Sequence, residues 1–330
     1  MRMTLTVCVL SGALSACVSG TPNAVSVPTA PAQTTVLTVA PTTVSAPECE
    51  GVTNQAASYS YKPDGPLPAT NALPRGSKMA AIKQRGRLIV GTAADVQLFA
   101  ARNPLSGKLE GFDVDMAREV SRAIFGDPDK IEFKVITYGQ RIPFLQENKV
   151  DLVAHTMTIK CTRWKLVAFS AEYFAASQRV LVRTDQQSKV QDFGDLDGQR
   201  VCVARGSTNI EELARHPKIV AVPVDELGEC LVKFQRGEVS AITGDDTVLR
   251  GFAAQDQYAF VTDKHLTEEP YGLGMSKNDP GFVKFVNAML ENMRATGRWD
   301  QIYCVWLAAS CTNGQPTNSS DRQPAAVYGR

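Results

Sequence analysis

The fold of this chain is decided by residues 155–174, HTMTIKCTRWKLVAFSAEYF. The segment follows a short apolar run that ends at Val153-Ala154, so it is expected to begin where a buried strand leaves a sheet. Thr156 and Thr158 come first, and Arg163 lies five positions after Thr158. An arginine offers two parallel N–H donors that match a carboxylate, and threonine hydroxyls and loop N–H groups add further donors. The pattern predicts a carboxylate-binding loop, and a plain surface loop is the alternative.

The composition is that of a globular protein with room for two domains. The chain has 330 residues, of which 44% are hydrophobic, and this is enough for a sizeable core in each domain. The formal net charge is +1 and no basic run occurs. A nucleic-acid partner is therefore not expected, because phosphate binding needs a concentrated Lys/Arg face.

The N-terminal residues have the pattern of an export signal. Arg2 precedes an apolar segment over residues 5–14, and Leu14-Ser15-Ala16-Cys17 follows. The apolar segment is too short to cross a bilayer as a permanent helix. Leu-Ser-Ala-Cys resembles the lipobox of bacterial lipoproteins, which implies removal of residues 1–16 and a lipid on Cys17 that holds the protein at the extracytoplasmic face of the cell membrane. An ordinary signal peptide with an incidental cysteine is the alternative.

The two ends of the mature chain are expected to lack a core. Residues 18–47 contain no charged side chain and are rich in Thr, Pro, Ala, Val and Ser, so residues 17–77 are predicted to form a lipid anchor, a disordered spacer and an N-terminal extension. Residues 312–330 are polar and are predicted to be a disordered tail.

The cysteines indicate disulfides in an exported protein. Without Cys8, which the signal would remove, and the lipidated Cys17, six cysteines remain, and an even number in such a chain is typical of disulfide pairing. Metal binding is the rival, but no C-x-x-C motif occurs and the three histidines are scattered, so no metal is predicted. Among the many possible pairings, we prefer Cys49 with Cys161, Cys202 with Cys230, and Cys304 with Cys311.

From residue 78 onward the chain alternates between strand and helix patterns. In the first unit, helices are expected at residues 78–85, from Asp113 as a cap to about 125, and at 142–147, with strands at 87–92, 131–136 and 150–154. In the second unit, strands are expected at residues 179–183, 200–204, 219–224 and 239–243. One helix is expected to begin near Asn209, and a second helix to include Cys230 and Phe234. One more strand after Tyr258 and two apolar-faced helices, from Asp279 and over 299–306, follow. This alternation predicts α/β units with parallel sheets and crossover helices.

Two strand-to-helix loops of the second unit are candidate binding loops. Arg205-Gly206-Ser207-Thr208 opens a helix, whose free N–H groups and positive dipole end suit an anion, although helix capping without a ligand is the alternative. Gly244-Asp245-Asp246 stands at the end of a buried strand, where α/β sheets gather ligands. Its two aspartates could cap a helix, bind a metal or take an ammonium group.

In chain order, these segments resemble the family 3 extracellular solute-binding proteins, which are the amino-acid-binding proteins of ABC importers. The resemblance covers about residues 78–307 and rests on RLIVG (87–91), GFDVD (111–115), VD (150–151) leading into TMTI (156–159) with Arg163, FS (169–170), VCVARGS (201–207), YG (271–272), and Gly297 with Trp306. Within the family, the chain is most similar to lipid-anchored glutamate and glutamine-type receptors of actinobacteria.

The resemblance implies an α/β, two-lobed, type II periplasmic-binding-protein-like fold with a hinge between the lobes. The first lobe would comprise residues 78–178 and 271–311, and the second, residues 179–270, would be inserted between them. The lobes of this family close on their ligand, which is a known mode of conformational switching. The expected partners are an amino acid, ABC permease and ATPase subunits, and the membrane through the lipid anchor. A monomer without cofactor is expected.

The resemblance also assigns roles in the ligand site. Arg163 would grip the α-carboxylate, helped by the Thr158 hydroxyl, the backbone N–H of Lys160 and the loop of Ser207 and Thr208. Asp245 would take the α-ammonium group with the carbonyl of Thr156, and Asp246 is the alternative if the register shifts by one. The candidates for the side-chain pocket are Tyr138, Phe99 and Tyr271. Gln97-Leu98-Phe99 departs from the prolines that are usual in the family, which leaves stacking on the ligand side chain open.

Selectivity is expected to depend on Arg141. The segment QRIP (140–143) resembles one in glutamate/aspartate receptors in which the arginine faces the distal carboxylate. Arg141 and Arg163 against Asp245 leave a charge of about +1, which matches an acidic amino acid and would leave Arg141 poorly paired with a neutral one. We therefore expect glutamate or aspartate first, asparagine or glutamine more weakly, and no arginine or lysine. A solvated arginine at a helix start is the alternative.

Two other functions could use the same fold. An amino-acid sensor that signals to a membrane partner needs the same pocket, and so the sequence does not separate it from an importer subunit. A dehydratase-like enzyme is known on this fold, but His155, His216 and His265 show no nucleophile–base spacing, and no catalytic residue is predicted. The chain is therefore not expected to be an enzyme.

Overall fold

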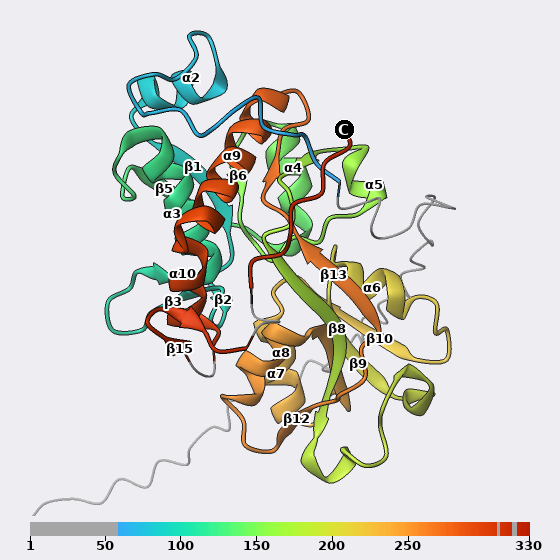
Figure 1. The fold of residues 1–330 in the computed structure, drawn as a ribbon. Coiled ribbons are helices and arrows are strands. Elements are labelled where there is room, and N and C mark those ends of the chain that lie inside the picture. The colour runs from blue at the N-terminus through green and yellow to red at the C-terminus, as the bar shows by residue number, and fades with distance from the viewer. Residues whose placement is uncertain (1–58, 309–310, 319–321) are drawn as a thin grey trace, which may run out of the picture. The chain divides into compact units, whose positions relative to one another are not determined.

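The computed structural model describes residues 59–308, 311–318 and 322–330 (Figure 1). The predicted signal peptide, Cys17 and residues 18–47 lie outside the described residues, as does Cys49 of the first predicted disulfide. Within the described ranges, no helix has both the length and the apolar character that crossing a membrane requires.

The first lobe is built on a five-stranded sheet with the strand order β5-β1-β6-β14-β7. Its strands are β1 (Leu88–Thr92), β5 (Ile131–Val135), β6 (Leu152–Val153), β7 (Ala168–Phe169) and β14 (Gly274–Met275). β1 pairs in parallel with β5 and β6, whereas β14 runs antiparallel to β6 and β7. Because β14 comes from far along the chain, this sheet combines two separate stretches of sequence.

Helices and a small sheet complete the first lobe. They are α2 (Lys78–Arg85), α3 (Phe112–Phe125), η1 (Tyr138–Gln140), α4 (Arg141–Gln146), α5 (Cys161–Trp164), α9 (Pro280–Thr296), α10 (Arg298–Trp306), and a sheet of β2 (Asp95–Val96), β3 (Ala100–Arg102) and β4 (Leu109–Glu110). Local sequence explains the limits of α9. Pro280 is tolerated in its first turn, and Gly297 ends it in the left-handed conformation, at φ +71°.

The second lobe is built on a six-stranded sheet with the order β10-β9-β11-β8-β12, in which β13 also pairs with β8. Its elements are β8 (Phe174–Arg183), η2 (Thr184–Gln186), η3 (Phe193–Leu196), β9 (Arg200–Ala204), α6 (Thr208–Leu213), β10 (Val220–Val224), α7 (Gly228–Gln235), β11 (Ala241–Asp245), α8 (Asp246–Ala253), β12 (Ala259–Val261) and β13 (Thr267–Tyr271). β9 is parallel to β10 and β11, and β8 is antiparallel to β11.

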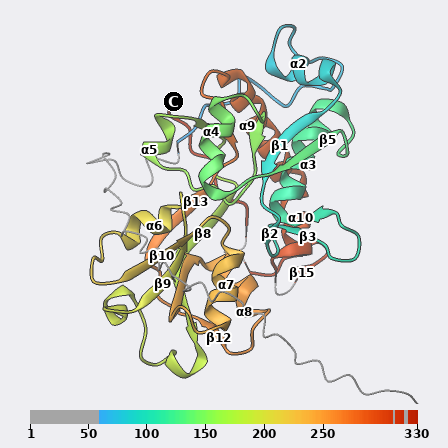
Figure 2. The ribbon, with the colours of Figure 1, turned by 180° about the vertical axis from the view of Figure 1, so that it is seen from behind.

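Two antiparallel strands connect the sheets (Figures 1 and 2). The chain leaves the first sheet through β7, enters the second along β8, and returns along β13 to β14. β8 and β13 are paired from Phe174↔Tyr271 to Gln178↔Thr267. The result is the two-lobed α/β fold that the sequence predicts, with this strand pair as the hinge.

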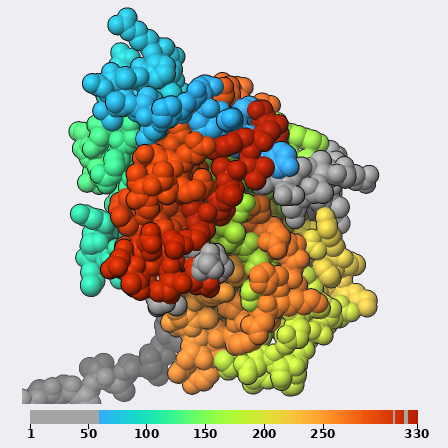
Figure 3. All heavy atoms as spheres, in the orientation of Figure 1, coloured from blue at the N-terminus to red at the C-terminus, as the bar shows by residue number. Residues whose placement is uncertain are grey.

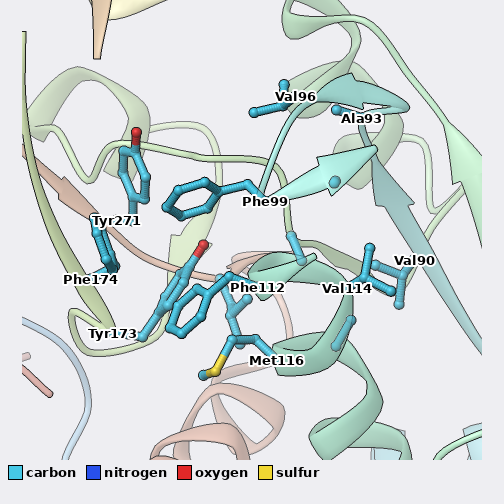
Figure 4. Close-up of a cluster of buried hydrophobic side chains, with 14 of the residues drawn as sticks. Val90, Ala93, Val96, Phe99, Phe112, Val114, Met116, Tyr173, Phe174 and Tyr271 are labelled. Carbon is cyan, nitrogen blue, oxygen red and sulfur yellow. The ribbon is translucent and has the colours of Figure 1, made fainter. Parts of the chain in front are cut away.

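An aromatic cluster lies where the hinge strands meet the first lobe (Figure 4). The ring of Phe99 points toward Phe174 and Tyr271, with centroid separations of 5.2 and 6.0 Å, and Phe112 packs against both Phe99 and Phe174, at 5.8 and 5.6 Å. Aromatic pairs at such distances contribute about 0.5–1.5 kcal/mol each beyond their buried area. The cluster therefore anchors the hinge strands to the first lobe.

Two of the predicted disulfides are confirmed. Cys202 is bonded to Cys230, which links β9 to α7, and Cys304 is bonded to Cys311, which links α10 to the hairpin of β15 (Cys311–Thr312) and β16 (Gln315–Pro316). Cys161 is also disulfide-bonded. Its predicted partner, Cys49, lies outside the described residues, and so that pairing stays a prediction.

The C-terminal residues differ from the expected disordered tail. Tyr328 forms a parallel bridge with Ser60, the Gln323 amide donates to the carbonyl of Leu290, and the Arg330 guanidinium lies 4.0 Å from the ring centre of Trp164. Figure 3 shows this segment in dark red beside the N-terminal extension in blue. The composition of the tail is polar, but its backbone pairs with the N-terminal extension and its long side chains contact the first lobe, which composition alone does not reveal.

Candidate functional site

Loops from both lobes meet beside β13 and bring together a group of residues that we call the interlobe cluster. It comprises Arg141, Thr158 and Arg163 from the first lobe, Gly206, Thr208 and Asp245 from the second, and Glu269 and Tyr271 from β13. All of its side chains are buried. The second-lobe members stand at the carboxyl ends of β9 and β11, the edge at which α/β sheets gather ligands.

Arg163 reaches from its own lobe to the other. On the short helix α5, its Nη1 donates to the carbonyl of Thr158 at 2.7 Å, and its Nη2 donates to the carbonyl of Gly206 at 3.3 Å. Burial lowers the pKa of this guanidinium, and nearby carboxylates, including Glu269 and Asp245, oppose that shift. The cluster therefore contains a buried cation that is held by carbonyl groups of both lobes.

Arg141 is hydrogen-bonded to four backbone carbonyl groups. Its guanidinium donates to the carbonyls of Tyr138, His155, Thr156 and Gly206 at 3.0–3.2 Å, and only 2% of the residue is exposed. Burial, with repulsion from Arg163, lowers its pKa to about 9, so it remains charged at neutral pH. The alternative of a solvated arginine is excluded. In this structure the side chain connects loops of the two lobes through hydrogen bonds.

Gly206 is a point of close contact between the lobes within the cluster. Its carbonyl accepts hydrogen bonds from both Arg141 and Arg163. Its φ is +77°, and a Cβ added there would lie 2.9 Å from the Cα of Gly139 in the first lobe. A side chain at this position would strain the backbone and also push the two loops apart.

Glu269 lies between two threonines that come from different lobes. Its Oε2 accepts hydrogen bonds from the hydroxyls of Thr158 and Thr208, each at 2.6 Å, and its Oε1 accepts one from Thr267 at 2.6 Å. The two threonine oxygens themselves are 3.3 Å apart. A carboxylate of the chain itself thus lies against the hydroxyl groups that the sequence assigns to a ligand carboxylate.

The two adjacent aspartates face different surroundings. Asp245 accepts hydrogen bonds from the Asn209 amide at 2.8 Å and the Tyr271 hydroxyl at 2.5 Å, and burial together with repulsion from Glu269 raises its pKa to about 7. Asp246 instead accepts from the backbone N–H groups of Ser177 and Thr247. Only Asp245 therefore belongs to the cluster.

Three other predicted residues have structural partners. The Ser207 hydroxyl caps α6 by accepting from the Ile210 N–H and donates to the carbonyl of Ala204. The Lys160 ammonium pairs with Glu211 across the lobes at 3.2 Å. The carbonyl of Thr156, assigned to the ligand ammonium group, accepts from Arg141.

Asp113 and Glu269 are site residues that sequence reasoning did not select. Asp113 was expected to cap α3, but Gly111 is the N-cap, and Asp113 is wholly buried. Its carboxyl group accepts from the Thr156 N–H at 2.7 Å and from the Tyr173 hydroxyl at 2.5 Å, and burial raises its pKa to about 6. Asp113 therefore holds the loop that carries Thr156 and Thr158. In the sequence, the only signals for these two residues were the place of Asp113 within GFDVD (111–115) and the place of Glu269 directly before PYG (270–272).

A pocket of about 260 Å³ adjoins the cluster. It is lined by Tyr138, Gly139, Arg141, Ile142, Met157, Thr162, Arg163, Leu166, Gly206 and Glu211. Of the predicted aromatic candidates, Tyr138 lines the pocket, whereas Phe99 is buried in the aromatic cluster beside Tyr271. Among the described residues, no group of side chains is arranged to hold a metal ion.

The chain is similar to known proteins over most of its length. It is 37% identical to the ABC transporter glutamine-binding protein GlnH of Bacillus subtilis, over 69% of this chain and 84% of that protein. It is 30% identical to the glutamate-binding protein GluB of Corynebacterium efficiens, over 68% of this chain and 80% of that protein. A crystal structure of a mutant ArgBP from T. maritima is 32% identical, with a TM-score of 0.66, and covers 69% of this chain and 98% of its own.

The family profile for bacterial extracellular solute-binding proteins, family 3, matches residues 88–309. These residues include both sheets, the hinge strands and all of the interlobe cluster. The relatives named above are binding proteins, which agrees with the expectation of a binding protein rather than an enzyme. By its sequence and its two-lobed fold, the chain belongs to the bacterial extracellular solute-binding proteins of family 3.

Proposed function

We propose that this protein is an extracytoplasmic receptor that binds glutamate, aspartate or one of their amides between its lobes and delivers it to an ABC importer. The observation that supports this most is the presence of a buried arginine on one lobe and a buried aspartate on the other, Arg163 and Asp245. An amino acid is a zwitterion, and so its α-carboxylate fits against Arg163 while its α-ammonium group fits against Asp245. The similarity to GlnH and GluB supports a ligand of this group.

The hydrogen bonds of Arg141 bear on the choice between acidic and neutral ligands. The sequence-based preference for acidic ligands assumes that a neutral ligand would leave this charge unpaired. Because four carbonyl oxygens already surround the guanidinium, a neutral ligand does not carry that penalty. We therefore include glutamine and asparagine in the proposed ligand group on equal terms with the acids.

Attachment to the membrane through a lipid on Cys17 is part of the same proposal. It rests on the Leu-Ser-Ala-Cys motif alone, since Cys17 lies outside the described residues. A sensor that signals to a membrane partner would use the same cluster. We favour the importer because the named relatives include an ABC transporter protein.

A thermal-shift panel of the twenty amino acids on the chain without its first 17 residues tests the proposed ligand group. At about one hundred times its dissociation constant, a ligand stabilises the folded state by about 2.7 kcal/mol, which corresponds to a shift in the melting temperature of roughly 4–5 °C for a protein of this size. We expect such shifts with members of the glutamate and glutamine group, and none with lysine or arginine. Shifts confined to basic amino acids would contradict the proposal.

Replacement of Gly206 by alanine is expected to weaken amino-acid binding by about tenfold or more, because the new Cβ would oppose the approach of Gly139. Gly198 offers a matched control, since it also has φ +77° but has no atom within 4 Å of an added Cβ. Gly198→Ala should lower stability without changing the dissociation constant measured by calorimetry. Equal dissociation constants for both variants would show that the Gly206 contact does not support closure.

A further inference from the structure

Glu269 occupies a central position that the proposed ligand contacts do not explain. It lies on the hinge strand β13, only 1% of it is exposed, and its carboxylate accepts three hydrogen bonds from threonine hydroxyls. No lysine, arginine or histidine nitrogen of the described residues lies within ion-pair distance of it. Burying a carboxylate without a direct counter-ion lowers the stability of the folded state, which favours a specific role for Glu269.

The hydrogen-bond directions change what the threonines can offer to a ligand. A hydroxyl has one proton, and in this structure Thr158 and Thr208 both donate theirs to Glu269. What remains on each hydroxyl is its acceptor lone pairs. The pair therefore presents acceptors to N–H groups, such as those of an ammonium or amide group, rather than donors to a carboxylate.

Glu269 also changes the charge of the site. The sequence-based count of about +1 set Arg141 and Arg163 against Asp245 alone. When Glu269 is included and Asp245 is ionised, as it would be beside a bound ammonium group, two buried cations face two buried anions, and the charges cancel. The influence of Glu269 on its neighbours agrees with this, because its charge is among the causes that raise the pKa of Asp245 and oppose the lowering of the pKa of Arg163.

We propose that Glu269 is a specificity-determining residue that makes the interlobe site select a neutral amino acid, with glutamine as the best fit, against glutamate and aspartate. The proposal rests on the proposed receptor function and deepens it. A neutral amino acid enters as a zwitterion and keeps the charges of the site balanced. Glutamate would add a second carboxylate to a site that already holds two, in surroundings of low dielectric where the repulsion is strong.

The test compares L-glutamine with L-glutamate by calorimetry on the chain without its first 17 residues, in the wild type and in Glu269→Gln. The wild type should bind glutamine more tightly. Glu269→Gln keeps the size and one acceptor oxygen but removes the charge, and it should shift the ratio of the two affinities toward glutamate by about tenfold or more. A merely structural defect would lower both affinities together and leave the ratio unchanged.

Glu268→Gln is the matched control, since it removes the same charge from the next residue of the strand, whose side chain is exposed. It should leave the ratio as in the wild type. A wild type that prefers glutamate, or an unchanged ratio in Glu269→Gln, overturns the role of Glu269 and leaves the receptor function standing. The first of these outcomes does not depend on whether the variant folds. Failure of the wild type to bind any amino acid overturns both proposals.

Discussion

Replacement of Arg163 by alanine is expected to weaken amino-acid binding by about 100-fold or more, because the proposed α-carboxylate would lose its cationic partner in a buried site. Lysine should restore only part of the affinity, since it keeps the charge but lacks the two parallel donors of a guanidinium. Calorimetry with the amino acid that gives the largest thermal shift measures both effects.

Arg205→Ala serves as the control for Arg163. Arg205 adjoins the Gly206 contact, but its guanidinium is half exposed and pairs with Asp225 on the surface. Its loss should change the dissociation constant little, because exposed ion pairs contribute less than about 1 kcal/mol. An Arg163→Ala variant that folds and binds within threefold of the wild type would remove Arg163 from the proposed site.

The affinity for an amino acid is expected to rise with pH up to about 7–8 and to fall by about tenfold per pH unit below 7. Burial and the charge of Glu269 raise the pKa of Asp245 to about 7, so near that pH this carboxyl group is partly protonated. A bound α-ammonium group favours the ionised form and lowers this pKa. Binding therefore releases a proton. The affinity for the amino acid falls as the pH falls, because the carboxyl group of Asp245 is then more fully protonated.

Calorimetry in buffers of different ionisation enthalpy measures the released proton directly. Asp245→Asn should abolish both the proton release and the pH dependence, and it should lower the affinity at pH 8 by about 100-fold, since the amide carries no charge to meet the ammonium group. Asp246→Asn is the control, because its carboxylate faces backbone N–H groups of β8 and α8. A wild-type affinity that stays level between pH 5.5 and 8 would contradict the assignment of Asp245.

The same raised pKa has a consequence for the stability of the protein without ligand. The unfolded chain loses the Asp245 proton near pH 4, whereas the folded chain keeps it until about pH 7. Between these values the folded state binds more protons, and so this group's contribution to the free energy of unfolding is largest below pH 4 and declines as the pH rises to about 7. Ligand binding and the contribution of Asp245 to the stability of the free protein thus depend on pH in opposite directions.

Much of the fold could be predicted from local pattern, and the exceptions have a common cause. The limits of α9 follow from Pro280 and Gly297, which act within their own turns. β8 begins at Phe174, five residues before the predicted strand at 179, because residues 174–178 pair with β13. The C-terminal segment is ordered by partners such as Ser60 and Trp164. For β8 and for the C-terminal segment, the partner lies far away in the sequence, and neither periodicity nor composition predicts such a pairing.

The sequence by itself determined the chemistry that is available at the site and the order in which it occurs. Thr158 and Arg163 share one loop, the Asp245-Asp246 pair ends a strand, and the motifs identified the family. Only the tertiary structure decided which groups are already paired. It turned Asp245 toward the cluster and Asp246 away, surrounded Arg141 with carbonyl oxygens, and placed Glu269 against Thr158 across 111 positions of sequence. The physical reason is that a residue type sets how many protons and charges a side chain has, whereas the partners that take them are set by positions in space.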